Sequence, residues 1–463
     1  MTDDQATYVN SRTEGKVRGF FNLMQVNQAV FFAVLLRVWQ LMAGAVSLLL
    51  IANYFTKELQ GYYYLFSSLM TLQAFFELGC TIVVINVASH EWSKLSLSDA
   101  GQIEGDPQAL SRLKSFAAML FKMYGVAAVL FSIVVGIGGA WFLSLDSSQS
   151  ISWRNPWWSL VIFSGFLLWS LPFNALLEGC NQVKQINRFR LVQAIVTNFV
   201  VWISLIVLQS LWVAVAATAV RLFCELALFF FLYRRFFDSL WKEKSVAKVG
   251  WREELWPLQW RLGLQGIFGY FAFSLYTPVM DRYREGGKEL AGQMGMTWML
   301  LFSLQAAALA WVQTRVPQFG MLIAEKEYGK LDRLFGKVTL VSCVMFLTGA
   351  GVLLGFLYGF RDFEWKIAER LLSPEIVSVF LLAIFLEHVP RCQSMYLRAH
   401  KKDPLWGLNL ITHGLTGFAV VWFGSRHGPL GAGLAYLSIV GILVLPMSSI
   451  IWKRCKNRWH EAV

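Results

Sequence analysis

The chain has 463 residues, of which 56% are hydrophobic and only 15% are charged. A soluble protein carries roughly 25% charged residues, so this chain has too few charges to cover the surface of two or three soluble domains. Its apolar runs are long enough to cross a bilayer as helices, and they do not alternate over about ten residues as barrel strands do. The composition therefore predicts an all-α polytopic membrane protein.

Long apolar runs between charged or Pro- and Gly-rich breaks predict about twelve membrane-spanning helices. The fifth and sixth form a tight hairpin, because only Gln209 and Ser210 separate them. In chain order the predicted spans cover 28–52, 61–89, 115–143, 157–178, 190–209, 211–233, 258–280, 291–314, 334–360, 374–397, 405–424 and 430–452.

The distribution of charge predicts the orientation of the chain. The formal net charge is +12, from 41 Lys and Arg against 29 Asp and Glu. If the N-terminus is cytoplasmic, the segments on its side of the membrane hold roughly 27 Lys and Arg, and the opposite segments hold roughly 9. Cytoplasmic loops are enriched in Lys and Arg, so both termini are predicted to be cytoplasmic. The positive charge follows from topology and does not indicate a nucleic-acid partner.

A short motif occurs twice in the sequence. Lys-Glu-Leu at 57–59, followed by Gly61, precedes the second predicted span, and Lys-Glu-Leu at 288–290, followed by Gly292, precedes the eighth. Six spans separate the copies, so both have the same orientation, as in two six-helix lobes related by an axis along the membrane normal. We expect an N-terminal lobe, a basic cytoplasmic linker and a C-terminal lobe over 1–233, 234–257 and 258–463.

The sequence contains none of the motifs that would indicate catalysis or metal binding. It has no G-x-x-x-x-G-K-[ST], H-E-x-x-H or G-x-S-x-G pattern, and its six cysteines show no C-x-x-C spacing. The predicted outer loops are short, the longest around 144–156 and 361–373, whereas a membrane glycan polymerase or ligase would need a large catalytic loop there. These features favour a transporter without enzymatic activity, cofactor or metal.

Polar residues inside the spans mark candidate sites, because a charge at the bilayer centre costs at least about 2.5–3.5 kcal/mol unless it faces protein or water. On the first two spans of each predicted lobe such residues recur at a spacing of three or four, which places them on one helix face. We interpret them as the lining of an aqueous cavity between the lobes: Arg37, Gln40, Gln73, Glu77, Arg261, Gln265 and Gln305. The alternative for Arg37 and Glu77 is an interhelical ion pair.

Two further pairs of opposite charge have the i,i+4 spacing that lets them neutralise each other on a helix. Arg221 and Glu225 are interpreted as a structural pair. Glu387 and Arg391 flank Pro390, which frees a backbone carbonyl and can kink a helix. Glu387, His388 and Arg391 are therefore either a static group or a site of gating or coupling.

The sign of the charge on the cavity candidates indicates the ligand. Arg37 and Arg261 offer guanidinium groups, which bind phosphate or carboxylate through paired hydrogen bonds. An exporter of cationic drugs should instead present carboxylates at these positions.

Several segments resemble the Wzx-type O-antigen and oligosaccharide flippases of the multidrug/oligosaccharidyl-lipid/polysaccharide exporter superfamily. They are YFTKELQGYYYLFSSLMTLQAFFELG with ASHEW within 54–92, AGQMGMT at 291–297, TRVPQFGMLIA at 314–324 and YLRAHKKDP at 396–404. The resemblance covers nearly the whole chain. It implies two MATE-like six-helix bundles in a V, alternating access and a cationic central cavity.

The resemblance also implies a substrate, which is a polyprenyl-pyrophosphate-linked oligosaccharide moved from the cytoplasmic to the periplasmic leaflet of a bacterial inner membrane. Arg37 and Arg261 would then hold the pyrophosphate, the glutamines would bind sugar hydroxyls, and Glu77 would balance or gate the arginines. Glycan polymerase and chain-length proteins would be partners. The alternative within the superfamily is a cation-coupled multidrug exporter. The coupling ion, H⁺ or Na⁺, stays open.

The predicted topology can be tested by labelling. Single cysteines placed in 234–257 should resist a membrane-impermeant thiol reagent in intact cells, and cysteines placed in 281–290 should react, because the first loop is predicted inside and the second outside. Labelling of the 234–257 loop in intact cells would contradict the orientation.

Overall fold

The computed structural model describes residues 31–33, 35–98, 100–145, 151–241, 250–251, 256–283, 287–359, 367–400 and 402–461. Apart from one short hairpin, the regular elements within these ranges are helices. The predicted linker lies only partly inside them, and the lobe boundary at 234–257 stays a prediction.

The first half of the chain begins with a helix at Phe31–Tyr54. The elements that follow it are α2 (Lys57–Met70), a short 3₁₀ turn (Thr71–Gln73), α3 (Ala74–Glu77), α4 (Cys80–Trp92), β1 (Leu95–Leu97), β2 (Ile103–Gly105), α5 (Pro107–Ser144), α6 (Arg154–Gly179), α7 (Val183–Val207), α8 (Trp212–Ala227), a π-helical turn (Leu228–Leu232) and α9 (Arg234–Trp241). The two strands pair antiparallel, with Ser96 opposite Glu104.

The second half consists of helices only, within the described residues. They are α10 (Trp256–Phe273), α11 (Tyr276–Asp281), α12 (Gly287–Gln313), α13 (Val316–Ala324), α14 (Tyr328–Gly359), a 3₁₀ turn (Ala368–Arg370), α15 (Pro374–Ala399), α16 (Trp406–Ile439), a π-helical turn (Val440–Val444) and α17 (Leu445–Glu461).

The described residues contain eight helices that are long and apolar enough to cross a membrane, or nine if the bent segment α2–α4 is one span. Three of the twelve predicted spans are not among these nine. Two of them correspond to α10 and α15. The third is missing because the last two predicted spans form a single helical stretch, 406–460, with a kink at Gly428. Polar side chains such as Glu387 and Arg391 lower the mean hydropathy of α15. The predicted fold class, an all-α polytopic membrane protein, is confirmed.

The predicted span at 61–89 is not one continuous helix. Leu78 and Gly79 both have left-handed backbone conformations, with φ of 51° and 65°, and the chain bends by 42° between α3 and α4. A Cβ at Gly79 would collide with the side chain of Leu262 on α10. Glycine therefore serves two purposes here, since it permits the left-handed turn and the close approach of α10.

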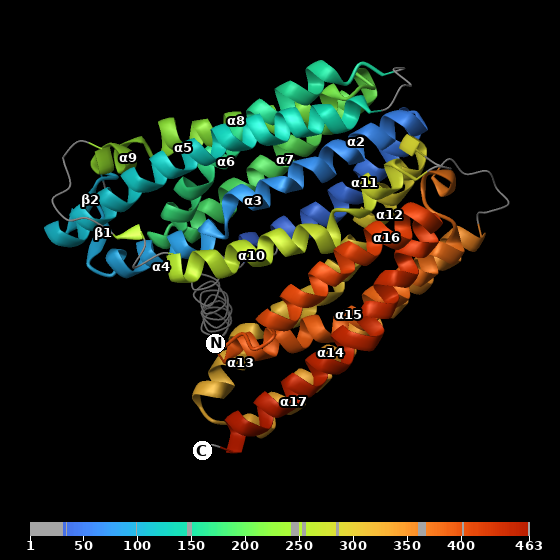
Figure 1. Cartoon of the computed structure of the whole chain (residues 1–463). Helices are drawn as coiled ribbons and strands as arrows, with labels where there is room; N and C mark the ends of the chain where they lie inside the picture. The colour runs from blue at the N-terminus through green and yellow to red at the C-terminus, as the bar shows by residue number, and fades with distance from the viewer. Residues whose placement is uncertain are drawn as a thin grey trace, which may run out of the picture.

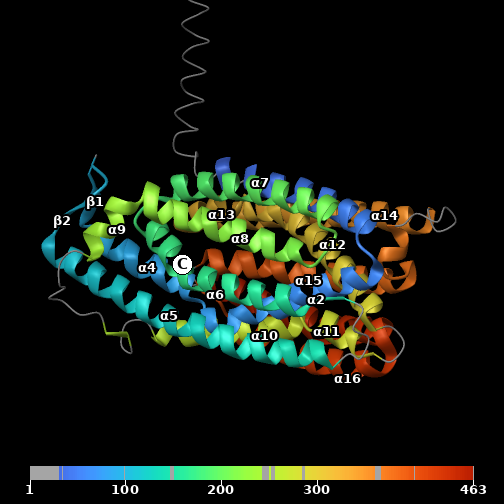
Figure 2. The same cartoon turned by 90° about the horizontal axis from the view of Figure 1, so that it is seen from above.

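The helices form two bundles arranged as a V (Figure 1). One bundle contains α5 to α9, and the other contains α13 to α17. Seen from above, α5 to α8 run alongside one another from the end that bears α9 and the hairpin (Figure 2). The largest hydrophobic core lies among residues 51–240, and two further cores are built mainly from residues 276–444 and 309–405. We call the part of the molecule built around the first core, with the helices up to α9, the N-lobe. The part built around the other two cores, with α10 to α17, is the C-lobe.

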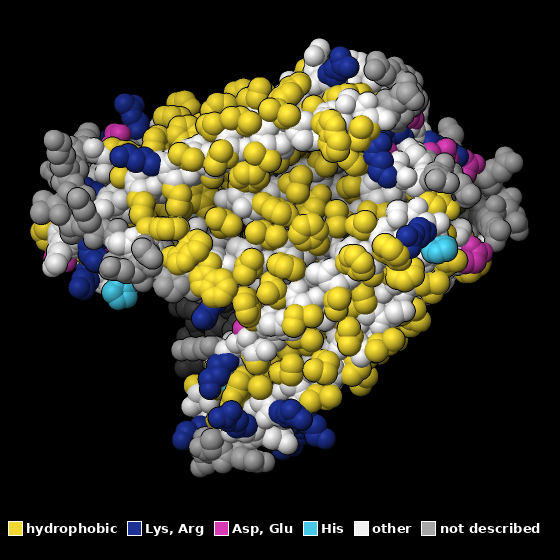
Figure 3. Space-filling view, viewed as in Figure 1, with side chains coloured by type: hydrophobic (Ala, Val, Ile, Leu, Met, Phe, Trp, Pro, Cys, Tyr) yellow, Lys and Arg dark blue, Asp and Glu magenta, His cyan; other side chains and the backbone are white. Residues whose placement is uncertain are grey.

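Apolar side chains cover the middle of both lobes, and Lys and Arg gather at their ends (Figure 3). This pattern is typical of a belt that contacts lipid between two charged interfaces. The lobes diverge toward the end that bears α9 and the C-terminus, which we call the open end, and converge where α2, α11 and α12 meet, which we call the closed end.

The two copies of the repeated motif pack on each other at the closed end. A Cβ at Gly61 on α2 would overlap the backbone carbonyl of Lys288 on α12, and a Cβ at Gly292 would lie 2.9 Å from the amide nitrogen of Gly61. The backbones of the two helices thus touch where each motif has its glycine, as small residues allow between membrane helices. The sequence repeat therefore forms one of the contacts between the two halves of the chain, beside that of Gly79 with α10.

Polar contacts surround this crossing. The ammonium group of Lys57 forms ion pairs with Glu289 at 2.9 Å and with Glu369 at 3.5 Å. The side-chain amide of Gln60 donates to the carbonyl oxygens of Gly292 at 3.0 Å and Arg370 at 3.2 Å. The guanidinium of Arg370 donates in return to the carbonyl of Phe55. Every one of these contacts joins α2 or its N-terminal approach to the second half of the chain.

The glycine contact makes a testable prediction about closure. Gly61→Leu should open the closed end, because overpacking a close contact costs about 1–3 kcal/mol, or roughly a tenfold change in population. Cysteines at positions 57 and 289, in a background without the native cysteines, report closure through cross-linking by a short bifunctional thiol reagent. Gly351→Leu is the control, because nothing lies within 4 Å of a Cβ at Gly351. Equal cross-linking in the two variants would show that the glycine contact does not hold this end closed.

Candidate functional site

Two adjoining pockets lie inside the N-lobe, and we call them together the N-lobe cavity. One has a volume of about 480 Å³ and lies among the first helix, α4, α6, α7 and α8. The other has a volume of about 350 Å³ and lies among α2, α6 and α8. Both are lined by Leu171, Asn174, Arg221 and Glu225. The cavity is a single region with α6 and α8 as its shared wall.

Helical periodicity places the polar residues of the cavity. On α8, Ala217, Arg221 and Glu225 recur at a spacing of four and share one face, where the small alanine leaves room in front of the charged side chains. On α7, Gln193 and Thr197 share a face in the same way. Beyond the first two turns of α7, which carry Lys184, Asn187 and Arg188, the other residues of these helices are mostly apolar, so the polar stripes of α7 and α8 meet inside the lobe.

The carboxylate of Glu225 is held by amides. The residue is buried, and its two oxygens accept hydrogen bonds from the side chains of Asn174 at 2.6 Å and Gln193 at 3.1 Å. The predicted ion pair between Arg221 and Glu225 is wrong, since no such contact forms between these two described residues. The i,i+4 spacing permits the pair on an isolated helix, but donors from α6 and α7 occupy the carboxylate instead.

The remaining charges of the cavity follow from this arrangement. Arg190, which lines the larger pocket, forms an ion pair with Glu178. Arg221 is exposed at the surface of both pockets and forms no ion pair with any residue that the structure describes. The carboxylates near the cavity are therefore already satisfied, and the guanidinium of Arg221 faces the open space.

Two of the predicted residues line pockets inside the N-lobe, and the predicted cavity between the lobes stays a prediction. Gln40 lies in the larger pocket and Gln73 in the smaller one. Arg37 is exposed on the first helix, and Glu77 is half-buried and accepts a hydrogen bond from the hydroxyl of Thr81 at 3.1 Å. Both residues are described, and no ion pair joins them, so the alternative of an Arg37–Glu77 pair is wrong for this conformation.

The predicted residues of the second lobe do not join the N-lobe cavity. Arg261 is exposed on α10, with its guanidinium 5.5 Å from the centre of the Trp260 ring, and Gln265 lies one turn further along. Gln305 is only 1% exposed, and its amide donates to the carbonyl of Ile384 at 3.4 Å. Gln305 therefore joins α12 to α15 inside the C-lobe core and offers no surface to a ligand.

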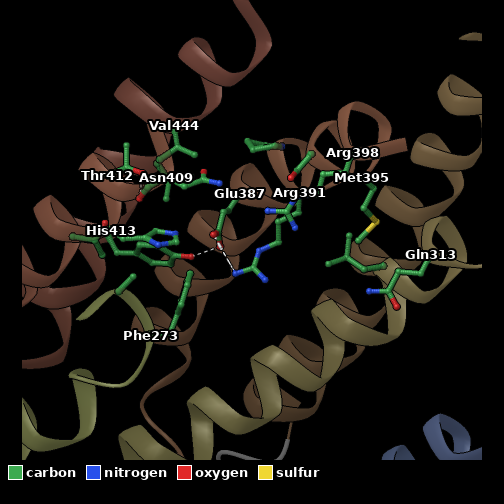
Figure 4. Close-up of a pocket in the computed structure, with 17 residues that line it drawn as sticks. Phe273, Gln313, Glu387, Arg391, Met395, Arg398, Asn409, Thr412, His413 and Val444 are labelled. Atoms are coloured by element: carbon green, nitrogen blue, oxygen red, sulfur yellow. Dashed lines mark hydrogen bonds and ion pairs between the residues drawn. The ribbon is translucent and has the colours of Figure 1, made fainter. Parts of the chain in front are cut away.

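A separate pocket of about 290 Å³ lies in the C-lobe among α10, α12, α15 and α16 (Figure 4). The predicted pair forms there, with 3.1 Å between the guanidinium of Arg391 and the carboxylate of Glu387. The hydroxyl of Tyr436 donates to the same carboxylate at 2.5 Å. The guanidinium of Arg391 also lies 5.2 Å from the centre of the Phe273 ring. The charges are thus mutually neutralised at the wall of the pocket.

His388 points away from this pocket. Its Nε2 lies 2.8 Å from the hydroxyl of Ser342, which in turn donates to the carbonyl of Ala308 at 2.7 Å. The residue is fully buried, and these contacts join α15 to α14 and α12. Another histidine, His413, lines the pocket instead (Figure 4).

The sequence prediction missed the residues that complete both pockets. Asn174, Arg190 and Gln193 in the N-lobe and Asn409 and His413 in the C-lobe were not among the candidates. Each is a polar residue in a predicted apolar span, which is the signal that could have identified it. The prediction followed the first two spans of each lobe and gave less weight to uncharged amides elsewhere.

No family model matches the sequence, and no curated protein matches it. Solved structures resemble the chain in fold. One is an inward-facing multidrug resistance MATE family transporter of the MOP superfamily, with a TM-score of 0.61 at 11% identity, covering 92% of this chain and 95% of that one. Another is the lipid II flippase MurJ in an inward closed conformation, with a TM-score of 0.53 at 14% identity, covering 93% and 87%.

A third similar structure is a MOP superfamily transporter from Pyrococcus furiosus, described as having a binding pocket of reverse polarity. Its TM-score is 0.52 at 12% identity, with 94% of this chain and 96% of that one covered. At such identities the likeness shows the fold, and the fold is that of MOP superfamily transporters. The chain is a multi-pass membrane protein, and the similar structures named above are transporters and a flippase.

The ion pair in the C-lobe makes a prediction about stability. Arg391→Gln should lower the free energy of unfolding by about 1–2 kcal/mol, because it leaves the buried carboxylate of Glu387 without its counter-charge. Glu387→Gln combined with Arg391→Gln should restore most of that loss. Thermal unfolding of the purified protein in detergent measures both effects. Arg398→Gln is the control, because its ion pair with Asp403 is exposed and should contribute little. A double variant less stable than Arg391→Gln would contradict this account.

Proposed function

We propose that the protein is a flippase that moves a polyprenyl-pyrophosphate-linked oligosaccharide, such as an O-antigen repeat unit, across the bacterial inner membrane by alternating access. One observation carries the proposal. In the N-lobe cavity the acidic groups are occupied by partners within the lobe, whereas the guanidinium of Arg221 is exposed without an ion pair among the described residues.

The charge of the cavity favours an anionic ligand. Glu225 keeps its negative charge but is buried in the wall, where it accepts two amide hydrogen bonds, and Glu178 is paired with Arg190, so the exposed charge of the cavity is the guanidinium of Arg221. Arg221 can donate two parallel hydrogen bonds to a phosphate, which is the geometry that guanidinium groups provide. Because such contacts strengthen away from bulk water, one exposed arginine in a membrane cavity is a strong determinant of ligand sign.

The uncharged polar residues favour a sugar beside the phosphate. Gln40, Gln73 and Asn198 line the cavity together with Thr81. Amides donate and accept hydrogen bonds at once, which suits the hydroxyl groups of an oligosaccharide.

Alternating access accounts for the closed end. To release a substrate there, the lobes would have to separate at the contact between Gly61 and Gly292, and the ion pairs of Lys57 would have to break. These pairs are exposed, so each contributes little by itself. The closed end therefore combines a close backbone contact with polar contacts that can be replaced by water.

The remaining assignments belong to the same proposal. Arg37 and Arg261 would hold the pyrophosphate at other stages of transport, since each is exposed and has no ion pair among the described residues. Glu77 would balance them, with Gln265 beside Arg261. Glu387, His388 and Arg391 would couple transport to H⁺ or Na⁺ or act in gating. Both termini would be cytoplasmic, and glycan polymerase and chain-length proteins would be partners.

A cation-coupled multidrug exporter is the second candidate. It is supported by the likeness to MATE transporters, among them the MATE multidrug transporter DinF-BH, whose solved structure gives a TM-score of 0.57 at 12% identity. That function predicts resistance to cationic compounds and no effect on surface glycan. The flippase function predicts the reverse.

Complementation distinguishes the two functions and tests the role of Arg221. The chain should restore surface glycan to a strain that lacks its flippase, as measured by glycan staining at matched expression. Arg221→Ala should reduce export at least about tenfold, because a hydrogen bond to a charged group contributes about 1.5–3 kcal/mol. Arg221→Lys should retain partial activity, since it keeps the charge without the planar fork.

The control is Arg154→Ala, which removes an exposed arginine over the Trp153 ring. Arg154 is the first residue of α6, whereas Leu171 and Asn174 of that helix line the cavity. It should export glycan like the unmodified protein. Wild-type export by Arg221→Ala would remove the main support for an anion site in the N-lobe cavity. Drug resistance without glycan export would favour the exporter instead.

A further inference from the structure

A second hollow lies on the outside of the N-lobe, and we call it the aromatic groove. It has a volume of about 430 Å³ and lies among α5, α6, α8 and α9. Its walls are almost entirely apolar, and most of its side chains are aromatic rings. The lining consists of Phe121, Phe166, Trp169, Ser170, Phe173, Leu222, Leu226, Phe229, Phe230, Arg234, Phe237, Asp238 and Trp241.

The groove and the N-lobe cavity lie on different faces of the same two helices. On α8, Leu222 and Leu226 line the groove, whereas Arg221 and Glu225 line the cavity on the adjacent face. Ser170 on α6 lines both the groove and the smaller pocket of the cavity. The wall formed by α6 and α8 therefore separates the groove from the cavity.

Rings in contact with one another form the walls of the groove. The Phe121 ring lies 4.8 Å from Trp169 and 5.2 Å from Trp241, centre to centre. On the other side Phe173 lies 5.7 Å from Phe229. Such contacts hold the rings in defined positions, so the groove is a shaped surface.

A basic pocket of about 520 Å³ adjoins the groove. It lies between α5, the β2 strand and α9, and it shares Arg234 and Asp238 with the groove. Its other charged residues are Arg235 and the buried Lys114, so the exposed cationic side chains of the pocket are those of Arg234 and Arg235. The full lining is Gln102, Ile103, Leu110, Lys114, Arg234, Arg235, Asp238 and Ser239.

The arginines of this pocket are available to a ligand. Arg234 is 75% exposed, and its contact with Asp238 is 3.9 Å long, so the pair is loose. Arg235 donates one hydrogen bond to the carbonyl of Ala100 at 3.0 Å and is otherwise exposed. The two side chains are fixed to the lobe by α9, because Phe236 and Leu240 of that helix are buried in the N-lobe core.

The position of the pocket matches the edge of a membrane. In Figure 1, α9 lies with β1 and β2 at the open end of the N-lobe, beyond the apolar middle of the bundle. Trp241 lies at the same end, as aromatic residues do at a membrane interface. Along the groove, the lining thus changes from apolar rings within the belt to cationic groups at its edge.

We infer that the aromatic groove and the basic pocket together bind one anionic phospholipid of the adjacent leaflet. The phosphate lies between Arg234 and Arg235, and an acyl chain lies along the rings. A basic pocket at the end of membrane helices recognises anionic headgroups, and the two exposed arginines select against zwitterionic lipids. The bound lipid packs on α6 and α8, beside the faces that line the N-lobe cavity.

Native mass spectrometry of the full-length protein in detergent tests the inference with three added probes. They are phosphatidylglycerol, phosphatidylcholine of the same chain length, and inorganic phosphate. Phosphatidylglycerol should bind at least about tenfold more tightly than phosphatidylcholine, and phosphate should give no saturable binding. Arg234→Gln with Arg235→Gln should abolish the preference for phosphatidylglycerol, and Leu226→Trp, which fills the groove, should weaken binding of both lipids.

The controls separate loss of the site from loss of the fold. Arg154→Gln removes an arginine at the other end of α6 and should keep the preference. Arg234→Lys with Arg235→Lys keeps the charges and should retain most of it. Equal binding of the two phospholipids, saturable binding of phosphate, or an unchanged preference in the glutamine variant would each overturn the inference. The measurement reads lipid binding alone, so its outcome is independent of the transported substrate.

Discussion

The close crossing of α2 and α12 is the contact on which the arrangement of the two lobes depends. Gly61 and Gly292 let the backbones touch, and Lys57, Gln60 and Arg370 surround that contact with polar groups. The lobes meet closely there and diverge at the other end. In the flippase proposed above, access would change by exchanging this closed end for another.

The second constraint is that charges inside a membrane protein must be satisfied, and this protein satisfies them unevenly. Glu225, Glu178 and Glu387 all have partners within their own lobes. Arg221 does not, within the described residues, and it faces the cavity. The exposed charge of the cavity is therefore positive, and the proposed preference for an anionic ligand rests on this uneven distribution.

Much of the fold was predictable because membrane-spanning helices are recognised from length and hydropathy. The apolar runs and the repeated Lys-Glu-Leu motif predicted the class and pointed to two related halves. The candidate site was predicted only in part. Gln40 and Gln73 line the N-lobe cavity, whereas the prediction placed them with Gln305 in one cavity between the lobes, and Gln305 is buried between α12 and α15. Periodicity shows which residues share a helix face, and it does not show which neighbour that face meets.

The sequence by itself determined that the chain crosses the membrane many times, since no folding choice can hide so many apolar residues from water. Only the tertiary structure decided the partners of the charged residues. Arg221 and Glu225 have the spacing of an ion pair, yet the carboxylate of Glu225 accepts hydrogen bonds from amides on two neighbouring helices instead. Local spacing permits a contact, but the competition among donors from distant segments selects it, and that competition exists only once the helices have packed.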